Sequence, residues 1–110
     1  GLEGVVVQGE LAKALNLGYD SGMLVQKVAA GSVADKLGLR PGKVPVTIAD
    51  RQIMLGGDII VSVEGVDVNE ANVAEMRRRM KQLLPNDTLK LEVKRAGRLV
   101  VLQARLPAKS

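Results

Sequence analysis

The sequence predicts a small α+β domain in which a mostly antiparallel sheet is closed by one long helix. Five or six short runs of β-branched and other aliphatic residues, several alternating with polar residues, are typical of strands. Between residues 69 and 84 the apolar spacing changes to that of a helix. With 110 residues, 46% of them hydrophobic and one of them aromatic, the chain is expected to form a single domain around branched aliphatic side chains.

The first third of the chain predicts two units, each a strand followed by a short helix. Residues 5–8 are a valine-rich run, and the apolar spacing of residues 9–16 suits two helical turns. After a glycine-rich turn, residues 23–28 predict the second strand. Ser32 is a good N-cap for a short helix that continues to Leu39.

The middle of the chain predicts strands joined by tight turns. Arg40-Pro41-Gly42 ends the second short helix, and two alternating runs within residues 44–55 predict a hairpin. An apolar strand follows at residues 59–63. The pair Glu64-Gly65 then turns the chain into a short strand at residues 66–68.

The last third predicts the long helix and a closing hairpin. Asn69 is a good N-cap, and the apolar residues after it recur at helical spacing: Val73, Met76, Met80, Leu83 and Leu84. Pro85-Asn86-Asp87 ends this helix, and Ala96-Gly97 joins two alternating strands. We expect residues 107–110 to be a frayed end or a linker.

Composition argues against catalysis by this chain. The sequence has no His and no Cys, so it lacks a Ser-His-Asp triad, a thiolate nucleophile and the usual zinc ligands. We therefore expect no catalytic residues, no metal, no cofactor and no enzyme activity. A Ser-Lys hydrolase using Ser21, Ser32 or Ser62 is the alternative, but no spacing singles out such a pair.

Charge and hydropathy also argue against two classes of binding partner. A net charge of +4 would suit phosphate binding, but single-strand binders need aromatic stacking platforms, and Tyr19 is the one aromatic residue. No apolar run approaches the ~20 residues of a membrane-spanning helix, and the first residues do not resemble a signal peptide. We expect no nucleic-acid partner and no membrane insertion, with any export signal upstream.

Three segments carry a family resemblance. Residues 57–66 read Gly-Asp-Ile-Ile-Val-Ser-Val-Glu-Gly-Val, residues 30–42 end in Gly-Leu-Arg-Pro-Gly, and Lys90 to Val101 form the closing hairpin. Together with the element order, they resemble the PDZ domain in the permuted bacterial form of the HtrA family of periplasmic serine proteases. The resemblance covers nearly the whole chain. It implies a PDZ-like small antiparallel β-sandwich or partly open barrel, capped by one long and two short helices.

One segment departs from the family pattern. Members of the family pass directly from Leu-Arg-Pro-Gly to Asp-x-Ile, whereas residues 43–57 intervene here. We interpret this segment as a β-hairpin insertion in a single PDZ domain of residues 1–110. We favour the interpretation that the insertion is a surface elaboration without function, because insertions in exposed loops cost little stability.

The resemblance places a carboxylate-binding loop at the start of the chain, formed by Leu2, Glu3, Gly4 and Val5. Its backbone N–H groups would converge on the terminal carboxylate of a peptide. Such convergence needs a tight turn, often with φ > 0, and therefore favours glycine. Against this, Glu3 would repel a carboxylate, and the segment could be no more than the end of the chain.

The strand that follows would offer a free edge to which an extended peptide could add as one more strand, through Val5, Val6 and Val7. An internal strand without a free edge is the alternative. The resemblance also turns three residues of the long helix toward the ligand: Val73, Arg77 and Met80. Apolar residues at helical spacing are more often plain core, which is the interpretation we prefer for Met76.

We therefore expect a peptide-binding module that recognises C-terminal or exposed hydrophobic polypeptide segments. The resemblance implies that it targets them to, or regulates, a linked serine protease in the bacterial periplasm or another extracytoplasmic compartment. The alternative is a structural or assembly domain whose groove is filled by a neighbouring subunit or by its own protein.

Overall fold

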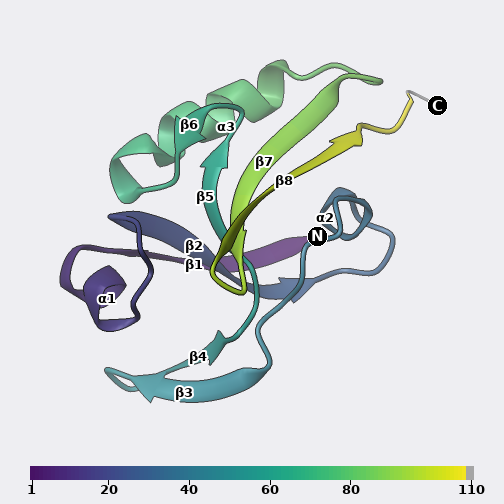
Figure 1. The fold of residues 1–110 in the computed structure, drawn as a ribbon. Coiled ribbons are helices and arrows are strands. Elements are labelled where there is room, and N and C mark those ends of the chain that lie inside the picture. Colours follow the sequence, from purple (N-terminus) through teal and green to yellow (C-terminus); the bar gives the residue numbers. More distant parts are fainter. Residues whose placement is uncertain (109–110) are drawn as a thin grey trace.

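The structure, a computed structural model, describes residues 1–108 (Figure 1). Its strands are β1 (Leu2–Gln8), β2 (Ser21–Val28), β3 (Val44–Ile48), β4 (Arg51–Leu55), β5 (Ile59–Val63), β6 (Val66–Asp67), β7 (Thr88–Arg95) and β8 (Arg98–Arg105). Its helices are α1 (Gly9–Ala14), α2 (Val33–Lys36), the 3-10 turn η1 (Glu70–Asn72) and α3 (Val73–Gln82). Pro107 and Ala108 have no regular structure, and residues 109–110 of the expected tail lie outside the described residues.

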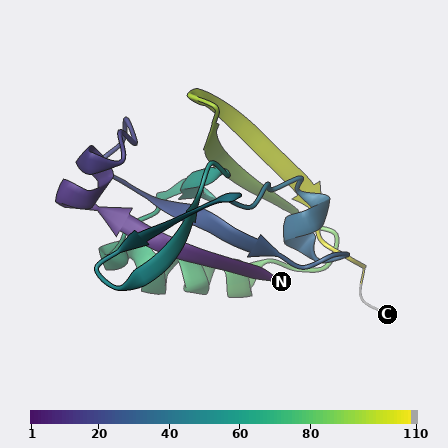
Figure 2. The same cartoon turned by 90° about the horizontal axis from the view of Figure 1, so that it is seen from below.

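Six strands form one antiparallel sheet in the order β1-β2-β5-β7-β8, with β6 paired to β5, while β3 and β4 pair with each other. The strands β1 and β8 are the two edges of the larger sheet, because each pairs with a single neighbour. The α+β prediction is confirmed, and the sheet does not close into a barrel (Figures 1 and 2). Residues 1–108 contain more strands than the predicted five or six, because short segments joined by tight turns also pair.

Two helix starts were predicted from caps, with different outcomes. The Ser32 hydroxyl accepts the Asp35 N–H at 3.2 Å and caps α2 as expected. Asn69 accepts the Asn72 N–H at 2.8 Å, but the residues it caps form η1, so α3 itself begins at Val73. The predicted helix of residues 69–84 is therefore too long at both ends. At the C-terminal end Leu83 is already extended, two residues before a proline.

The core consists of two aliphatic clusters on opposite faces of the sheet. The larger cluster contacts α2 and α3 and includes Val25, Ile60, Val68, Met76, Leu91 and Val93. The smaller cluster lies among β1, α1, β2 and β4 and consists of Val7, Ala12, Leu17, Leu24 and Ile53. Strand alternation turns Val6 toward the larger cluster, and Val5 and Val7 toward the smaller one. Met76 is a core residue, as preferred above.

The main buried charge is Asp58, at the entry to β5, of which 1% is exposed. Its carboxylate accepts two hydrogen bonds from Arg95, at 2.8 Å from Nε and 2.7 Å from Nη2, and one at 2.9 Å from the Arg40 N–H. Arg95 also donates to the Gly38 carbonyl at 2.8 Å. Hydrogen bonding to Asp58 raises the pKa of Arg95. These charge-assisted hydrogen bonds tie the end of β7 to the loop before β3.

A β3–β4 hairpin occupies the segment where alternation predicts one (Figure 1). It is attached to the sheet through Gln26, which the β1–β2 register skips as a bulge. The Gln26 side chain accepts the Met54 N–H at 2.8 Å and donates to the Met54 carbonyl at 2.9 Å. The side-chain amide thus pairs with β4 as a strand backbone would, and holds Ile53 in the smaller cluster.

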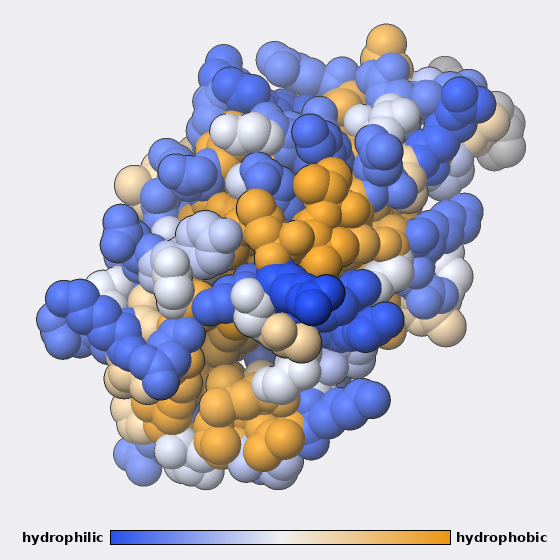
Figure 3. All heavy atoms as spheres, in the orientation of Figure 1, coloured by the Kyte–Doolittle hydropathy of each residue, from blue (hydrophilic) through white to orange (hydrophobic). Residues whose placement is uncertain are grey.

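Apolar side chains are also exposed on one face of the molecule. Figure 3 shows them over β8 and over the β3–β4 hairpin, where Leu99 is 52%, Val101 50% and Val44 56% exposed. Within residues 1–108 no helix is both long and apolar enough to cross a membrane. The same residues contain no cluster of three acidic side chains suited to a metal ion.

Candidate functional site

On the free edge of β1, every second residue directs its backbone N–H and C=O groups away from β2. At the two ends of the β1–β2 ladder, Ala29 donates to the Gly1 carbonyl at 2.8 Å and Gly9 donates to the Asp20 carbonyl at 3.3 Å. These bonds fix the alternation of an antiparallel pair. The residues whose N–H and C=O groups point away from β2 are therefore Leu2, Gly4, Val6 and Gln8.

A cavity of about 650 Å³ adjoins the Leu2 end of this edge. Leu2 and Met23 border it from the sheet, Ser32 and Val33 border it from α2, and its floor includes Ile60, Leu89 and Leu91. The residues of α3 that line it are Val73, Met76, Arg77, Met80 and Lys81. Its size is that of a typical small-ligand pocket, and its walls are almost entirely aliphatic.

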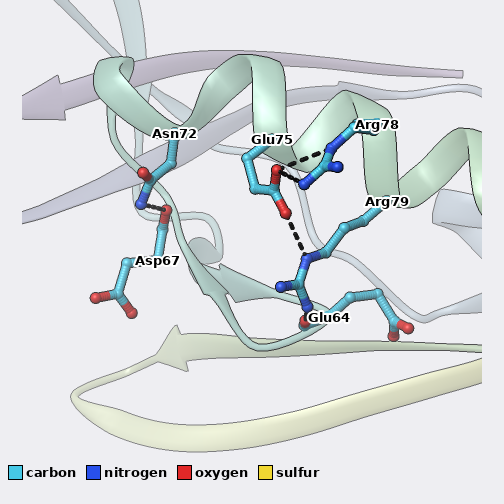
Figure 4. A network of polar contacts seen from close by, with 6 residues as sticks. All are labelled: Glu64, Asp67, Asn72, Glu75, Arg78 and Arg79. Atoms are coloured by element: carbon cyan, nitrogen blue, oxygen red, sulfur yellow. Dashed lines mark hydrogen bonds and ion pairs between the residues drawn. The ribbon is translucent and has the colours of Figure 1, made fainter.

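The helix α3 runs beside β1 in the opposite direction. The Glu70 N–H donates to Gln8 Oε1 at 3.1 Å, so the segment leading into α3 lies beside the end of β1. At the other end, Lys81 and Leu2 border the same cavity. Figures 2 and 4 show the two elements side by side. The result is a groove with a strand edge on one side and a helix on the other.

The structure brings together four of the predicted site residues, which all border the cavity: Leu2, Val73, Arg77 and Met80. Val6 lies farther along the exposed edge, with its side chain against the larger cluster. Glu3, Val5 and Val7 direct their backbone groups to β2, so they do not offer the edge that was expected of them. Val7 is in addition fully buried in the smaller cluster.

The start of the chain is extended in this structure, where a carboxylate-binding loop was expected. Leu2, Glu3 and Gly4 are part of β1, and Gly4 is not among the glycines with positive φ. A Cβ at position 4 would overlap the Met23 side chain, which would have to shift to make room for it. In this conformation consecutive N–H groups point to alternate sides of the strand, so they do not converge on one anion.

Met23, Ser32 and Lys81 also border the cavity, although none of them was predicted to bind the peptide. Lys81 could have been found, because it follows Arg77 by four residues and so lies on the same face of the helix. Met23 and Ser32 carry no such signal, since their position depends on how β2 and α2 pack against α3.

The other side of α3 carries a network of ion pairs (Figure 4). Glu75 forms ion pairs with Arg78 and with Arg79, whose Nε lies 2.9 Å from Glu75 Oε1. Arg79 also donates to the Glu64 carbonyl at 3.2 Å, which connects α3 to the β5–β6 turn. Hydrogen bonds from Arg79 and Arg78 lower the pKa of Glu75, so it is ionised at neutral pH.

Comparison with known proteins agrees with this architecture. The sequence model of the family described as "PDZ domain" matches residues 4–106. The chain is also 29% identical, over 106 residues, to "Periplasmic pH-dependent serine endoprotease DegQ" of Escherichia coli (strain K12). That match covers 96% of this chain and 20% of the endoprotease, so the chain spans about one fifth of the length of this relative. The predicted resemblance is confirmed, and the chain belongs to the PDZ domain family.

Proposed function

We propose that this chain binds polypeptide segments by adding them as an extra strand to β1, with one apolar side chain of the ligand in the adjoining cavity. The observation that carries the proposal is the position of the cavity beside an unpaired strand edge. The edge supplies backbone hydrogen bonds that any sequence can make, and the cavity supplies the selection of side chains.

The cavity lining favours flexible or branched aliphatic side chains as the buried group. Met23, Met76 and Met80 contribute three unbranched thioether side chains to its walls, and methionine adapts its shape to different partners. Met80 is 40% exposed, so its side chain can move without disturbing the core. C-terminal and exposed hydrophobic segments of other polypeptides both fit this description.

The proposal extends to the protein of which such a domain would be part. The similar endoprotease is named as periplasmic. We propose that this chain serves a linked serine protease in an extracytoplasmic compartment, as a module that delivers substrate or regulates cleavage. A sequence encoding Gly-x-Ser-Gly, with His and Asp, upstream of residue 1 would support this extension.

Backbone methylation of the ligand tests strand addition directly. A hexapeptide ending in Val-Leu is prepared with a single N-methyl group at each amide in turn, and its affinity is measured by fluorescence polarisation. We expect a period of two: methylation of amides that face β1 weakens binding roughly tenfold, the loss of about one hydrogen bond, and methylation of the intervening amides has little effect.

Changes in NMR chemical shifts on addition of the peptide identify where it binds. We expect shifts along Leu2–Gln8 and Val73–Lys81, and little change in β8. Binding that is equally weakened by every N-methyl group, or that shifts β8 but not β1, would show that the proposal is wrong. A groove already occupied by a second copy, seen as a dimer that excludes the peptide, would favour the assembly role.

A further inference from the structure

The methionines of this chain are concentrated around the cavity. Of the four in the sequence, Met23, Met76 and Met80 line the cavity, and Met54 lies in β4. The sequence contains no Cys and no Trp. Thioether sulfurs are therefore the side-chain groups that a hydroperoxide oxidant attacks most readily in this chain, and three of the four belong to the proposed binding site.

The four methionines differ in their access to solvent. Met80 is 40% exposed, whereas Met76 is 8% exposed and belongs to the larger core cluster. Met23 and Met54 are partly buried. Because oxidation follows exposure, Met80 should react before the other three.

The position of Met80 in α3 separates the binding site from the core. Met76 and Met80 are four residues apart, so they lie on the same face of the helix. Met76 packs in the larger cluster, but Met80 is in neither of the two core clusters and borders the cavity. An oxygen atom added to Met80 would therefore leave the core intact, whereas the same change at Met76 would place a polar group among buried aliphatic side chains.

We infer that Met80 is a site of reversible oxidation, where a hydroperoxide converts the thioether to a sulfoxide and thereby weakens the binding of apolar ligands. The Met80 sulfur attacks one oxygen of the hydroperoxide, and the O–O bond breaks as the S–O bond forms. The sulfur is oxidised by two electrons and the hydroperoxide is reduced by two, so that hydrogen peroxide leaves as water. The effect on binding rests on the proposed function, whereas the site of oxidation does not.

The oxidised side chain is a poorer wall for an aliphatic anchor. Oxidation replaces a flexible apolar group by a polar one, whose oxygen accepts hydrogen bonds from water. An anchor that entered the cavity would displace this water, and few lining side chains can replace it as donors: Ser32, Arg77 and Lys81. Arg77 and Lys81 are themselves exposed. Removing water from a polar group without a new partner is unfavourable, so affinity should fall while the fold is retained.

Limited treatment with hydrogen peroxide, stopped with catalase, tests the site of oxidation. Mass spectrometry of proteolytic peptides measures the sulfoxide at each methionine, and we expect Met80 to react several times faster than Met76. Circular dichroism should show that the chain stays folded. Saturating Gly-Ser-Gly-Ser-Val-Leu, which contains no oxidisable side chain, should slow the reaction of Met80 more than that of Met54, which does not line the cavity.

The polarisation titration with the same peptide measures the consequence for binding. We expect oxidation to weaken binding about tenfold, and methionine sulfoxide reductases to restore it. Met80→Leu has an apolar side chain without sulfur, so its affinity should be the same before and after peroxide treatment. Met54→Leu is the matched control and should lose affinity as the wild-type chain does.

Three results would overturn the inference and leave the proposed function standing. They are oxidation of Met80 no faster than that of Met76, an unchanged affinity after Met80 is oxidised, and an equal loss of affinity in Met80→Leu and the wild-type chain. The last result would assign the effect to Met23. Absence of peptide binding by the untreated chain overturns the proposed function and the effect on affinity with it, while mass spectrometry still decides the site of oxidation.

Discussion

The two edges of the sheet, β1 and β8, have the same backbone chemistry but different surroundings. Each pairs with one neighbour and leaves alternate N–H and C=O groups unpaired. α3 runs beside β1 and leaves a cavity there, whereas no residue of β8 borders that cavity. The comparison teaches that an open edge selects a ligand only where a second element provides room for side chains.

The exposed apolar residues of β8 do not create such room. Leu99 and Val101 are about half exposed on the outer face of the β7–β8 hairpin (Figure 3). They stand on a surface without a facing wall, and the edge is flanked by Arg98 and Arg105. Charged residues at a strand edge discourage pairing with another chain.

The largest effect is expected where the turn end of the β7–β8 hairpin is attached to the start of β5. Asp58→Ala removes the buried partner of Arg95 and the acceptor of the Arg40 N–H. We expect the free energy of unfolding in urea to fall by about 3 kcal/mol, the lower end of the cost of breaking a buried pair, because Arg95 retains some access to solvent.

Arg98→Ala, at the exposed start of β8, is the control for this prediction and should change stability by no more than about 0.5 kcal/mol. A loss below about 1 kcal/mol for Asp58→Ala would mean that the ion pair does not hold the turn end of the β7–β8 hairpin, against the buried-pair argument.

An intermediate effect is expected from removing one N–H group at each edge. Val6→Pro and Val101→Pro both delete an outward-facing donor on an edge strand, a position where proline is tolerated. We expect Val6→Pro to weaken peptide binding roughly tenfold, through the loss of one hydrogen bond and its alignment. Val101→Pro should leave the affinity unchanged.

The measurement is the same polarisation titration, with circular dichroism to show that both variants remain folded. Val6→Ala keeps the N–H group and should bind within about threefold of the wild-type chain. An equal loss of peptide affinity in the two proline variants would show that the peptide does not distinguish the edge of β1 from that of β8.

The smallest effect is expected in α3, the helix that lies beside β1 and has no counterpart beside β8. Hydrogen bonds from Arg79 and Arg78 lower the pKa of Glu75 below its usual value of 4.5. A group whose pKa is lowered by folding adds stability that is complete above its unfolded pKa and is lost as the pH falls through its folded pKa. The ion pairs of Glu75 should therefore stabilise α3 at neutral pH and cease to do so in acid.

We expect the Tm of Glu75→Gln to lie about one to two degrees below that of the wild-type chain at neutral pH. The difference should close as the pH falls through the lowered pKa of Glu75, where the carboxylate loses its charge. A gap that persists in acid would show that packing of the side chain, and not its charge, is responsible.

The sequence predicts the elements of this fold better than the geometry of its site. Alternating and helical spacing indicate most strands and helices, and the Ser32 cap is found where expected. The start of α3 is displaced because Asn69 satisfies a 3-10 turn as well as an α-helix. A cap identifies which N–H is accepted, but not how tightly the following residues are wound.

The differences between the expected and the observed positions of the site residues have a common physical cause. Gly4 lies in a strand because the pairing of β1 with β2 extends to Leu2, and no local pattern encodes that pairing. In the same way, the orientation of Glu3, Val5 and Val7 follows from the β1–β2 register. Helix faces are easier to predict, because Val73, Arg77 and Met80 are fixed relative to one another by the 3.6-residue period.

The hydrogen bond between the Glu70 amide and the Gln8 side chain limits the length of chain that the groove can accept. An added strand can align with the edge from Leu2 to Val6, but beyond this point it meets the bond that joins the two walls. Affinity should therefore stop rising once a ligand has about five residues, each spanning ~3.4 Å. Long unfolded polypeptides would then be held by one brief stretch, leaving the rest of the chain unrestrained.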